Sequence, residues 1–203
     1  LDRTLYAIAD HNPMIIRFLP GRASATINET RRYFQNSDNI AYHIREQVKK
    51  VIRPLLANNE QVLVIGHSMG SIIAYDTFWE LSHIEHRQEK LDFLTLGSPL
   101  GMNFVQHRLC GNNERDMRKY PTLIRHWINV AAVGDVTALD RHFQDDFQPM
   151  LDLGIIDSIE DHTDGIYNFF HNEQGLNCHR SYGYLVNPAT GKVIADWWHS
   201  SAG

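Results

Sequence analysis

The stretch Gln61–Gly70, QVLVIGHSMG, decides the fold. Its first half, residues 61–65, is a short aliphatic run bounded by polar residues and a glycine, which is typical of a fully buried parallel strand. Its second half, Gly66–Gly70, matches the pattern G-x-S-x-G. Apolar residues at helical spacing from Ile72 to Leu81 predict a helix directly after it. The sequence therefore predicts a strand, a sharp turn and a helix.

The serine of this pattern stands where a nucleophile is needed. A serine hydroxyl is a poor nucleophile at its ordinary pKa, so a sharp turn must present it to a base. Gly66 and Gly70 remove side chains that would collide in such a turn. The same turn directs the backbone N–H of Met69 toward the oxygen that becomes negative in a tetrahedral intermediate. Ser68 is thus a candidate nucleophile and Met69 a candidate oxyanion-hole donor, and the alternative is a helix-capping serine in a glycine-rich turn.

Strands and helices alternate on both sides of this motif. Before it, apolar residues at helical spacing over residues 40–55 predict a helix, with Ser37 as its N-cap and its end at residues 58–59. After it, Leu91–Leu96 and Leu123–Val133 are strand candidates that each lead into a glycine-containing turn. This order favours an α/β fold, with a mostly parallel sheet flanked by helices.

The whole chain is predicted to form a single domain, 1–203. Its 203 residues, of which 43% are hydrophobic, can bury one sizeable core. Two polar, histidine-rich stretches, 102–120 and 141–178, are expected to be cap or loop insertions over the site. The alternative is that they are ordinary surface loops with a short helix each.

Charge and composition exclude several classes of partner. The formal charge of -5 gives no broad basic surface for nucleic acid or anionic lipid. No stretch approaches the roughly 20 apolar residues that an integral membrane helix needs. Cys110 and Cys178 are too few for a disulfide framework and could be reduced thiols or one bridge, so the compartment stays open, with a cytoplasmic location favoured. Because the chain begins with Leu1, we expect that further sequence precedes it. The oligomeric state stays open.

Four segments resemble the lipase and esterase branch of the α/β-hydrolase family, over about residues 37–198. The resemblance implies an α/β-hydrolase fold and a serine hydrolase of carboxylic esters, with a small-molecule or lipid ester as substrate and no cofactor. The segments are similar to the nucleophile elbow, the end of the next strand, the strand before the acid and the late histidine loop of that family. They are Val62–Gly70, Leu94–Gly101, Trp127–Asp135 and His179–Tyr182.

The family's chain order of nucleophile, acid and histidine implies Ser68, Asp135 and His179. His179 would accept the serine proton and return it to the leaving group, while Asp135 would hold the imidazole and stabilise the imidazolium. Asp140 is a rival for the acid. Asp135 is favoured because a Gly-Asp turn at the carboxyl end of a strand places the carboxylate at the active edge of the sheet.

Three other histidines also follow the candidate acid. His142 comes soon after it and leaves little room for the elements that usually separate acid and histidine. His162 and His171 fall inside the polar insertion. His179 instead precedes the apolar residues 182–186, so a loop there could return its ring to the sheet edge. The sequence favours His179 as the general base.

The departure from the family lies at the front of the chain. Relatives place a strand that ends in a glycine-rich loop upstream of the elbow, and this loop donates the second N–H of the oxyanion hole. Residues 1–36 contain Pro20-Gly21 after an apolar run, but no His-Gly or Gly-Gly loop. The second donor is therefore unassigned, and we expect it to lie upstream of Leu1 or to have a form without this pattern.

Other functions use the same residues differently. A metal site between residues 157 and 179 is disfavoured, because its histidines and carboxylates lack the spacing of H-E-x-x-H, CxxC or a calcium loop. A binding protein with this fold but no activity is an alternative, although Ser68, Asp135 and His179 argue against it. An acyltransferase or thioesterase would use the same three residues.

Overall fold

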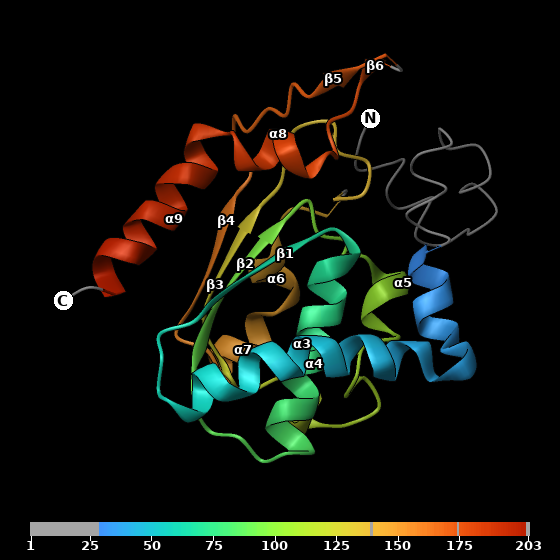
Figure 1. Cartoon of the computed structure of the whole chain (residues 1–203), viewed down its shortest axis with the longest axis vertical. Coiled ribbons are helices and arrows are strands. Elements are labelled where there is room, and N and C mark those ends of the chain that lie inside the picture. The colour runs from blue at the N-terminus through green and yellow to red at the C-terminus, as the bar shows by residue number, and fades with distance from the viewer. Residues whose placement is uncertain (1–28, 139, 174, 202–203) are drawn as a thin grey trace.

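A four-stranded parallel sheet forms the centre of the molecule (Figure 1). The computed structural model describes residues 29–138, 140–173 and 175–201. Each pair of neighbouring strands is parallel. This sheet confirms the predicted α/β class. In their order across the sheet, the strands are β1 (Leu63–His67), β2 (Leu91–Leu96), β3 (Ile124–Val130) and β4 (Ser158–His162).

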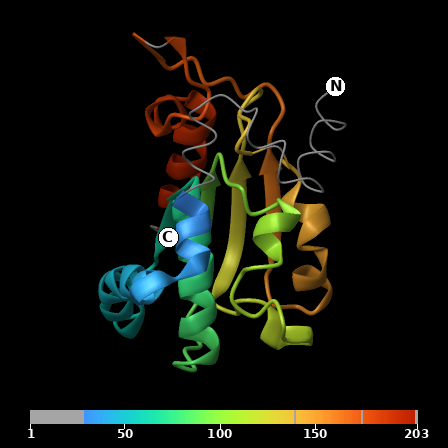
Figure 2. The ribbon, with the colours of Figure 1, turned by 90° about the vertical axis from the view of Figure 1, so that its right-hand side faces the viewer.

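Helices cover both faces of the sheet (Figures 1 and 2). One face carries α3 (Ile40–Ala57), α4 (Met69–His83), α5 (Asn103–Gln106), α6 (Phe143–Asp146) and α7 (Gln148–Asp152). The other face carries α8 (Ser181–Leu185) and α9 (Pro188–Ser201). A short antiparallel hairpin of β5 (His171–Asn172) and β6 (Gly175–Leu176) lies beyond α8.

The strands alternate their side chains between two apolar clusters. Phe93 and Trp127, paired in register on β2 and β3, pack toward α4, α6 and α7. The next pair, Leu94 and Ile128, packs toward α8 and α9. Successive side chains of a strand point to opposite faces, so a sheet that is covered on both sides buries apolar residues on both of them. The buried polar residues Asp92, Thr95 and Asn129 on β2 and β3 are hydrogen-bonded.

The helix before the motif is present, but its predicted N-cap is wrong. Ser37 lies in a 3-10 turn, η2 (Ser37–Asn39), and α3 begins after it. The side chain of Asn36 accepts the N–H of Ala41 at 2.9 Å instead. Asn36 and Asn39 have φ of 49° and 56°. Asparagine adopts this left-handed conformation more readily than most residues, so the chain bends here before the helix begins.

Strand β1 is less buried than the sequence predicts. Within the described residues it pairs with β2 alone and forms one edge of the sheet. Its Ile65 is 41% exposed. An apolar run indicates a strand but does not show whether a neighbour covers both of its sides, which is why the prediction of full burial fails.

A fourth strand lies inside the stretch 141–178, which the sequence analysis assigned to a cap or loop. β4 pairs with β3, and Ile159 is its only fully buried residue. Because an edge strand tolerates polar side chains, its sequence resembles that of a loop. The stretch 102–120 contains α5 and the 3-10 turn η3 (Asp116–Lys119), and its Val105 is buried in the core.

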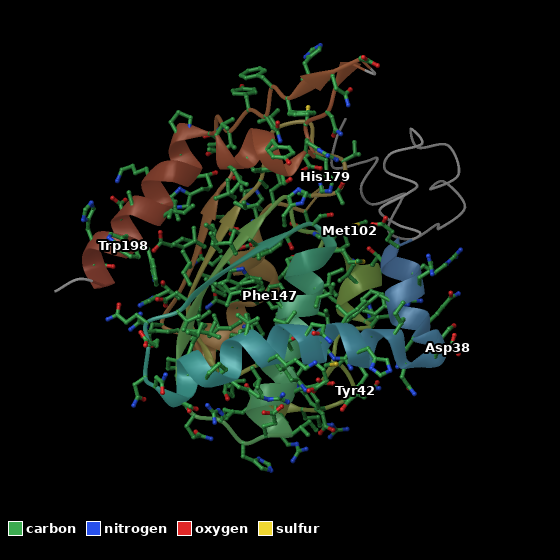
Figure 3. All side chains as sticks on the ribbon, in the orientation of Figure 1. Asp38, Tyr42, Met102, Phe147, His179 and Trp198 are labelled. Atoms are coloured by element: carbon green, nitrogen blue, oxygen red, sulfur yellow. The ribbon has the colours of Figure 1, made fainter. Side chains whose placement is uncertain are left out.

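The predicted site residues lie at one end of the sheet. The carboxyl ends of parallel strands share one edge. Ser68 directly follows β1, Gly97 follows β2 and Asp135 lies in the turn after β3. His179 comes from the loop before α8, at the same end of the molecule (Figure 3).

Candidate active site

Ser68 occupies a strained turn between β1 and α4. Its φ is 54° and its ψ is -129°, a combination that non-glycine residues rarely adopt. Such residues destabilise a fold by about 1 to 3 kcal/mol and persist where the surrounding structure holds them. The Ser68 N–H donates to the carbonyl of Leu96 at 3.1 Å, which ties the turn to β2. The residue is only 8% exposed.

The two glycines of the motif differ in what they allow. A Cβ on Gly66 would lie 2.8 Å from the Cα of Ser71, so only glycine fits. A Cβ on Gly70 would meet no described atom within 4 Å. The predicted steric need for glycine therefore holds at Gly66. At Gly70, in the first turn of α4, an added Cβ would collide with no described neighbour.

Two buried serines support the turn from below. Ser71 Oγ donates to the Ser68 carbonyl at 2.5 Å and lies 2.6 Å from Ser98 Oγ. Since the Ser71 proton goes to the carbonyl, the Ser98 hydroxyl donates to Ser71. These bonds connect the start of α4 to the segment after β2. Sequence reasoning did not single out either serine.

The structure brings Ser68, His179 and Asp135 into one chain of hydrogen bonds. His179 Nε2 lies 2.7 Å from Ser68 Oγ, and His179 Nδ1 lies 2.9 Å from Asp135 Oδ2. A carboxylate only accepts, so Nδ1 carries the proton. In the neutral imidazole Nε2 is then an acceptor for the serine hydroxyl. This is the arrangement that proton transfer from serine to histidine requires.

The Asp135 side chain is buried and fully hydrogen-bonded. Its Oδ2 also accepts the hydroxyl of Tyr184 at 2.6 Å, and its Oδ1 accepts the N–H of Thr137 at 2.9 Å. The Tyr184 hydroxyl accepts the N–H of Ala132 at 2.9 Å. Burial raises the pKa of Tyr184, and the charge of Asp135 raises it further, so the phenol keeps its proton. Tyr184 is thus a fourth member of the network that the sequence analysis missed.

Gly97 leaves the space that this network occupies. Its φ is +53°, and an added Cβ would lie 2.7 Å from Asp135 Oδ2 and 2.9 Å from the Tyr184 hydroxyl. The glycine lies in the segment Leu94–Gly101, which carries the family resemblance. A side chain here would displace either the carboxylate or the tyrosine ring.

His67, the second residue of the motif, also contacts His179. Its Nε2 lies 2.7 Å from the backbone carbonyl of His179, and the two rings are 4.8 Å apart. Burial lowers the pKa of His67, and the neighbouring His179 lowers it further. The motif itself marks this position as unrestricted, so the sequence carried no signal for it.

The alternative candidates for the acid and the general base are not part of this hydrogen-bonded chain. Asp140 accepts the N–H of His142 at 3.2 Å, so it forms a local turn before α6. His142 is exposed. His162 lies on β4 with its Nε2 3.5 Å from Glu160, and His171 is exposed on β5.

The candidate oxyanion-hole donor is the backbone N–H of Met69. The Met69 N–H opens α4, a helix of 15 residues, and makes no hydrogen bond with another described residue. A helix N-terminus favours negative charge. The sequence assigns no second donor within residues 1–36, and residues 1–28 lie outside the described part of the chain.

The described residues contain no group of three or more His, Cys, Asp or Glu side chains placed to hold a metal ion. None of their helices is both long and apolar enough to cross a lipid bilayer.

A parallel sheet flanked by helices, with a serine in the turn after β1, defines an α/β-hydrolase. The chain belongs to the class 3 lipases, because the model of the family described as lipase (class 3) matches residues 16–136. The matched range includes Ser68 and Asp135 and ends before His179. Membership in this family points to a lipase-like ester hydrolase. Comparisons with curated proteins and with solved structures gave no significant match.

Proposed function

We propose that the protein hydrolyses carboxylic esters through an acyl-enzyme on Ser68. The observation that carries the proposal is the continuous chain of hydrogen bonds from Ser68 Oγ through the imidazole of His179 to Asp135. Family membership supports the reaction class. A lipid acyl ester is one candidate substrate, and the family name is the only support for that choice.

The reaction begins when Ser68 Oγ attacks the ester carbonyl carbon and its proton moves to His179 Nε2. The buried carboxylate of Asp135 stabilises the imidazolium that forms. The Met69 N–H and the N-terminus of α4 stabilise the developing oxyanion. The C–O bond to the alcohol then breaks as His179 returns the proton to it. Water, deprotonated by His179, then attacks the acyl carbon, the bond between that carbon and Ser68 Oγ breaks, and His179 returns the proton to Ser68 as the acid leaves.

Substitution of the nucleophile tests this proposal. We expect Ser68→Ala to lower kcat on p-nitrophenyl esters by on the order of a thousandfold or more, and to abolish labelling by a fluorophosphonate probe. Ser82→Ala is the matched control, because Ser82 lies near the end of α4, the helix that follows Ser68, is also buried and donates to the Phe78 carbonyl. A panel of esters with graded acyl chain length would then define the substrate.

Near-normal esterase activity in a folded Ser68→Ala protein would refute the assignment. A wild-type chain that neither hydrolyses any ester nor labels with the probe would favour a binding protein with this fold. Labelling with slow hydrolysis but fast transfer to an added alcohol or thiol would favour an acyltransferase.

A further inference from the structure

His67 joins the turn that carries Ser68 to the loop that carries His179. The two histidines are 112 residues apart in the sequence, yet the Nε2 of His67 lies 2.7 Å from the carbonyl of His179. The planes of their rings differ by 32°, and the His67 ring also lies 5.9 Å from that of Tyr184. The proposed reaction does not use His67, because its ring bonds to the backbone of His179 and not to the serine.

The chemistry of this bond requires a hydrogen on Nε2 of His67. A carbonyl oxygen only accepts, so Nε2 must carry the hydrogen. Burial and the proximity of His179 and Arg180 lower the pKa of His67, while the hydrogen bond and the charge of Asp135 act in the opposite direction. Burial is the largest of these effects, and it favours a neutral ring that donates from Nε2.

Apart from the His179 ring, which bonds to Ser68 and Asp135, the loop around His179 is held mainly by its own part of the chain. The His179 N–H donates to the side chain of Asn177 at 3.2 Å, and the Arg180 carbonyl accepts the amide of Asn168 at 2.8 Å. Both of these partners belong to the same part of the chain, between β4 and α8. The carbonyl of His179 is instead held by a residue that is covalently bonded to the nucleophile. The bond between His67 Nε2 and the His179 carbonyl therefore opposes loop shifts that would change the distance from Ser68 Oγ to His179 Nε2.

We infer that His67 is a positioning residue that sets the distance between Ser68 Oγ and His179 Nε2 through its hydrogen bond to the His179 carbonyl. This inference rests on the proposed function. Misplacement of a reacting group by about 1 Å can lower a rate by on the order of a hundredfold, so a bond that fixes this distance acts on kcat. It does not require contact with substrate, so KM should change little.

Three substitutions of His67 separate the hydrogen bond from the ring. His67→Phe keeps an aromatic ring and removes the donor, and we expect kcat to fall by about tenfold or more with KM within about twofold. His67→Gln can place an amide N–H near the position of Nε2, and should keep kcat within about threefold of wild type. His67→Asn is polar but too short to reach the carbonyl, so it should resemble the Phe variant.

His83 offers a matched control on the same helix as the motif. Its Nε2 lies 2.8 Å from the carbonyl of Tyr120, so it makes the same kind of bond far from Ser68. His83→Phe should lower Tm by a similar amount as His67→Phe and leave kcat unchanged. All rates are to be divided by the number of active sites titrated with a fluorophosphonate, which removes the contribution of unfolded protein.

Two results would overturn the inference. The first is an equal kcat per titrated site in His67→Phe, His83→Phe and wild type. The second is a loss of kcat in His67→Phe that His67→Gln shares, because the donor would then not be the cause. If the Phe variant does not fold, the comparison of His67→Gln with His67→Asn decides alone. An inactive wild type, or an active Ser68→Ala, would instead refute the proposed function and is distinguishable from both.

Discussion

Two buried aspartates in this protein each accept a hydrogen bond from a tyrosine but belong to different networks. Asp135 accepts the hydroxyl of Tyr184 at 2.6 Å, and Asp76 accepts the hydroxyl of Tyr33 at 2.8 Å. Each also accepts one backbone N–H. Both carboxyl groups are buried. The aspartate–tyrosine pair by itself therefore does not mark a catalytic group.

The next group in each network makes the difference. At Asp135 it is the imidazole of His179, whose protonation state can change during a reaction. At Asp76 the tyrosine accepts a hydrogen bond from Arg45, which is also ion-paired with Glu80 at 2.8 Å. An arginine keeps its proton at every relevant pH. The first pair can thus support proton transfer, while the second joins Asp76 of α4 to Tyr33 and, through it, to Arg45 of α3.

The largest effect is expected at the histidine of the first pair. His179→Ala removes the proposed base and should lower kcat by on the order of ten-thousandfold. Alanine at His142, His162 or His171 should leave kcat within about threefold, because these residues lie away from Ser68. Ester hydrolysis, with folding checked by circular dichroism, measures all four. Wild-type turnover in His179→Ala together with its loss in another of the four would show that the general base is wrongly assigned.

Neutralising each aspartate compares the two sites directly. Asp135→Asn should lower kcat by on the order of a thousandfold, because the imidazole loses its acceptor and the imidazolium its counter-charge. Asp76→Asn should leave kcat within about threefold. Asp140→Asn serves as a second control in the same part of the chain as Asp135. The assignment of the acid would move if Asp140→Asn abolished activity and Asp135→Asn did not.

Titration of Asp76 should make the stability of the protein depend on pH. Burial raises the pKa of Asp76 to about 6, against the opposing effects of its hydrogen bonds and of Arg45. Because the folded-state pKa is raised, stability from this group is fully present below about pH 4 and is lost as the pH rises through about 6. The free energy of unfolding of wild type relative to Asp76→Asn should fall by about 3 kcal/mol over this window. Urea unfolding at several pH values measures it, and a difference that does not change with pH would contradict the buried, proton-binding carboxyl.

The smallest effect is expected from the two tyrosines. Tyr184→Phe removes a donor to Asp135 and should lower kcat by about fivefold to tenfold with little change in KM. Tyr33→Phe should leave kcat unchanged and lower the free energy of unfolding by about 1 to 2 kcal/mol. Equal kcat in both variants would mean that Tyr184, like Tyr33, only stabilises the fold.

Local patterns in the sequence predicted the centre of the fold. The apolar run, the glycine turn and the helical spacing after it correspond to β1 and α4, and β2 has the predicted bounds of Leu91–Leu96. These elements are determined by residues close in sequence. The sequence also named Ser68, Asp135 and His179, which the structure brings together. Their catalytic roles stay predictions.

Features that depend on distant contacts were missed. Only Ile159 of β4 is fully buried, so nothing in its sequence separates that strand from a polar loop. Tyr184 reaches Asp135 from 49 residues away, and its apolar neighbourhood gives no indication of a bond to a carboxylate. His67 stood within the quoted motif, but its partner lies 112 residues further on. Pairings of this kind arise from packing and have no local pattern.

The close fit around Gly97 also constrains protein engineering. A mutagenesis library that aims to change the substrate preference of this chain would naturally vary the residues around Ser68, and Gly97 is among them. Its left-handed φ and the position of an added Cβ, 2.7 Å from Asp135 Oδ2, exclude even alanine without displacement of the carboxylate. We therefore expect glycine at this position in every active clone.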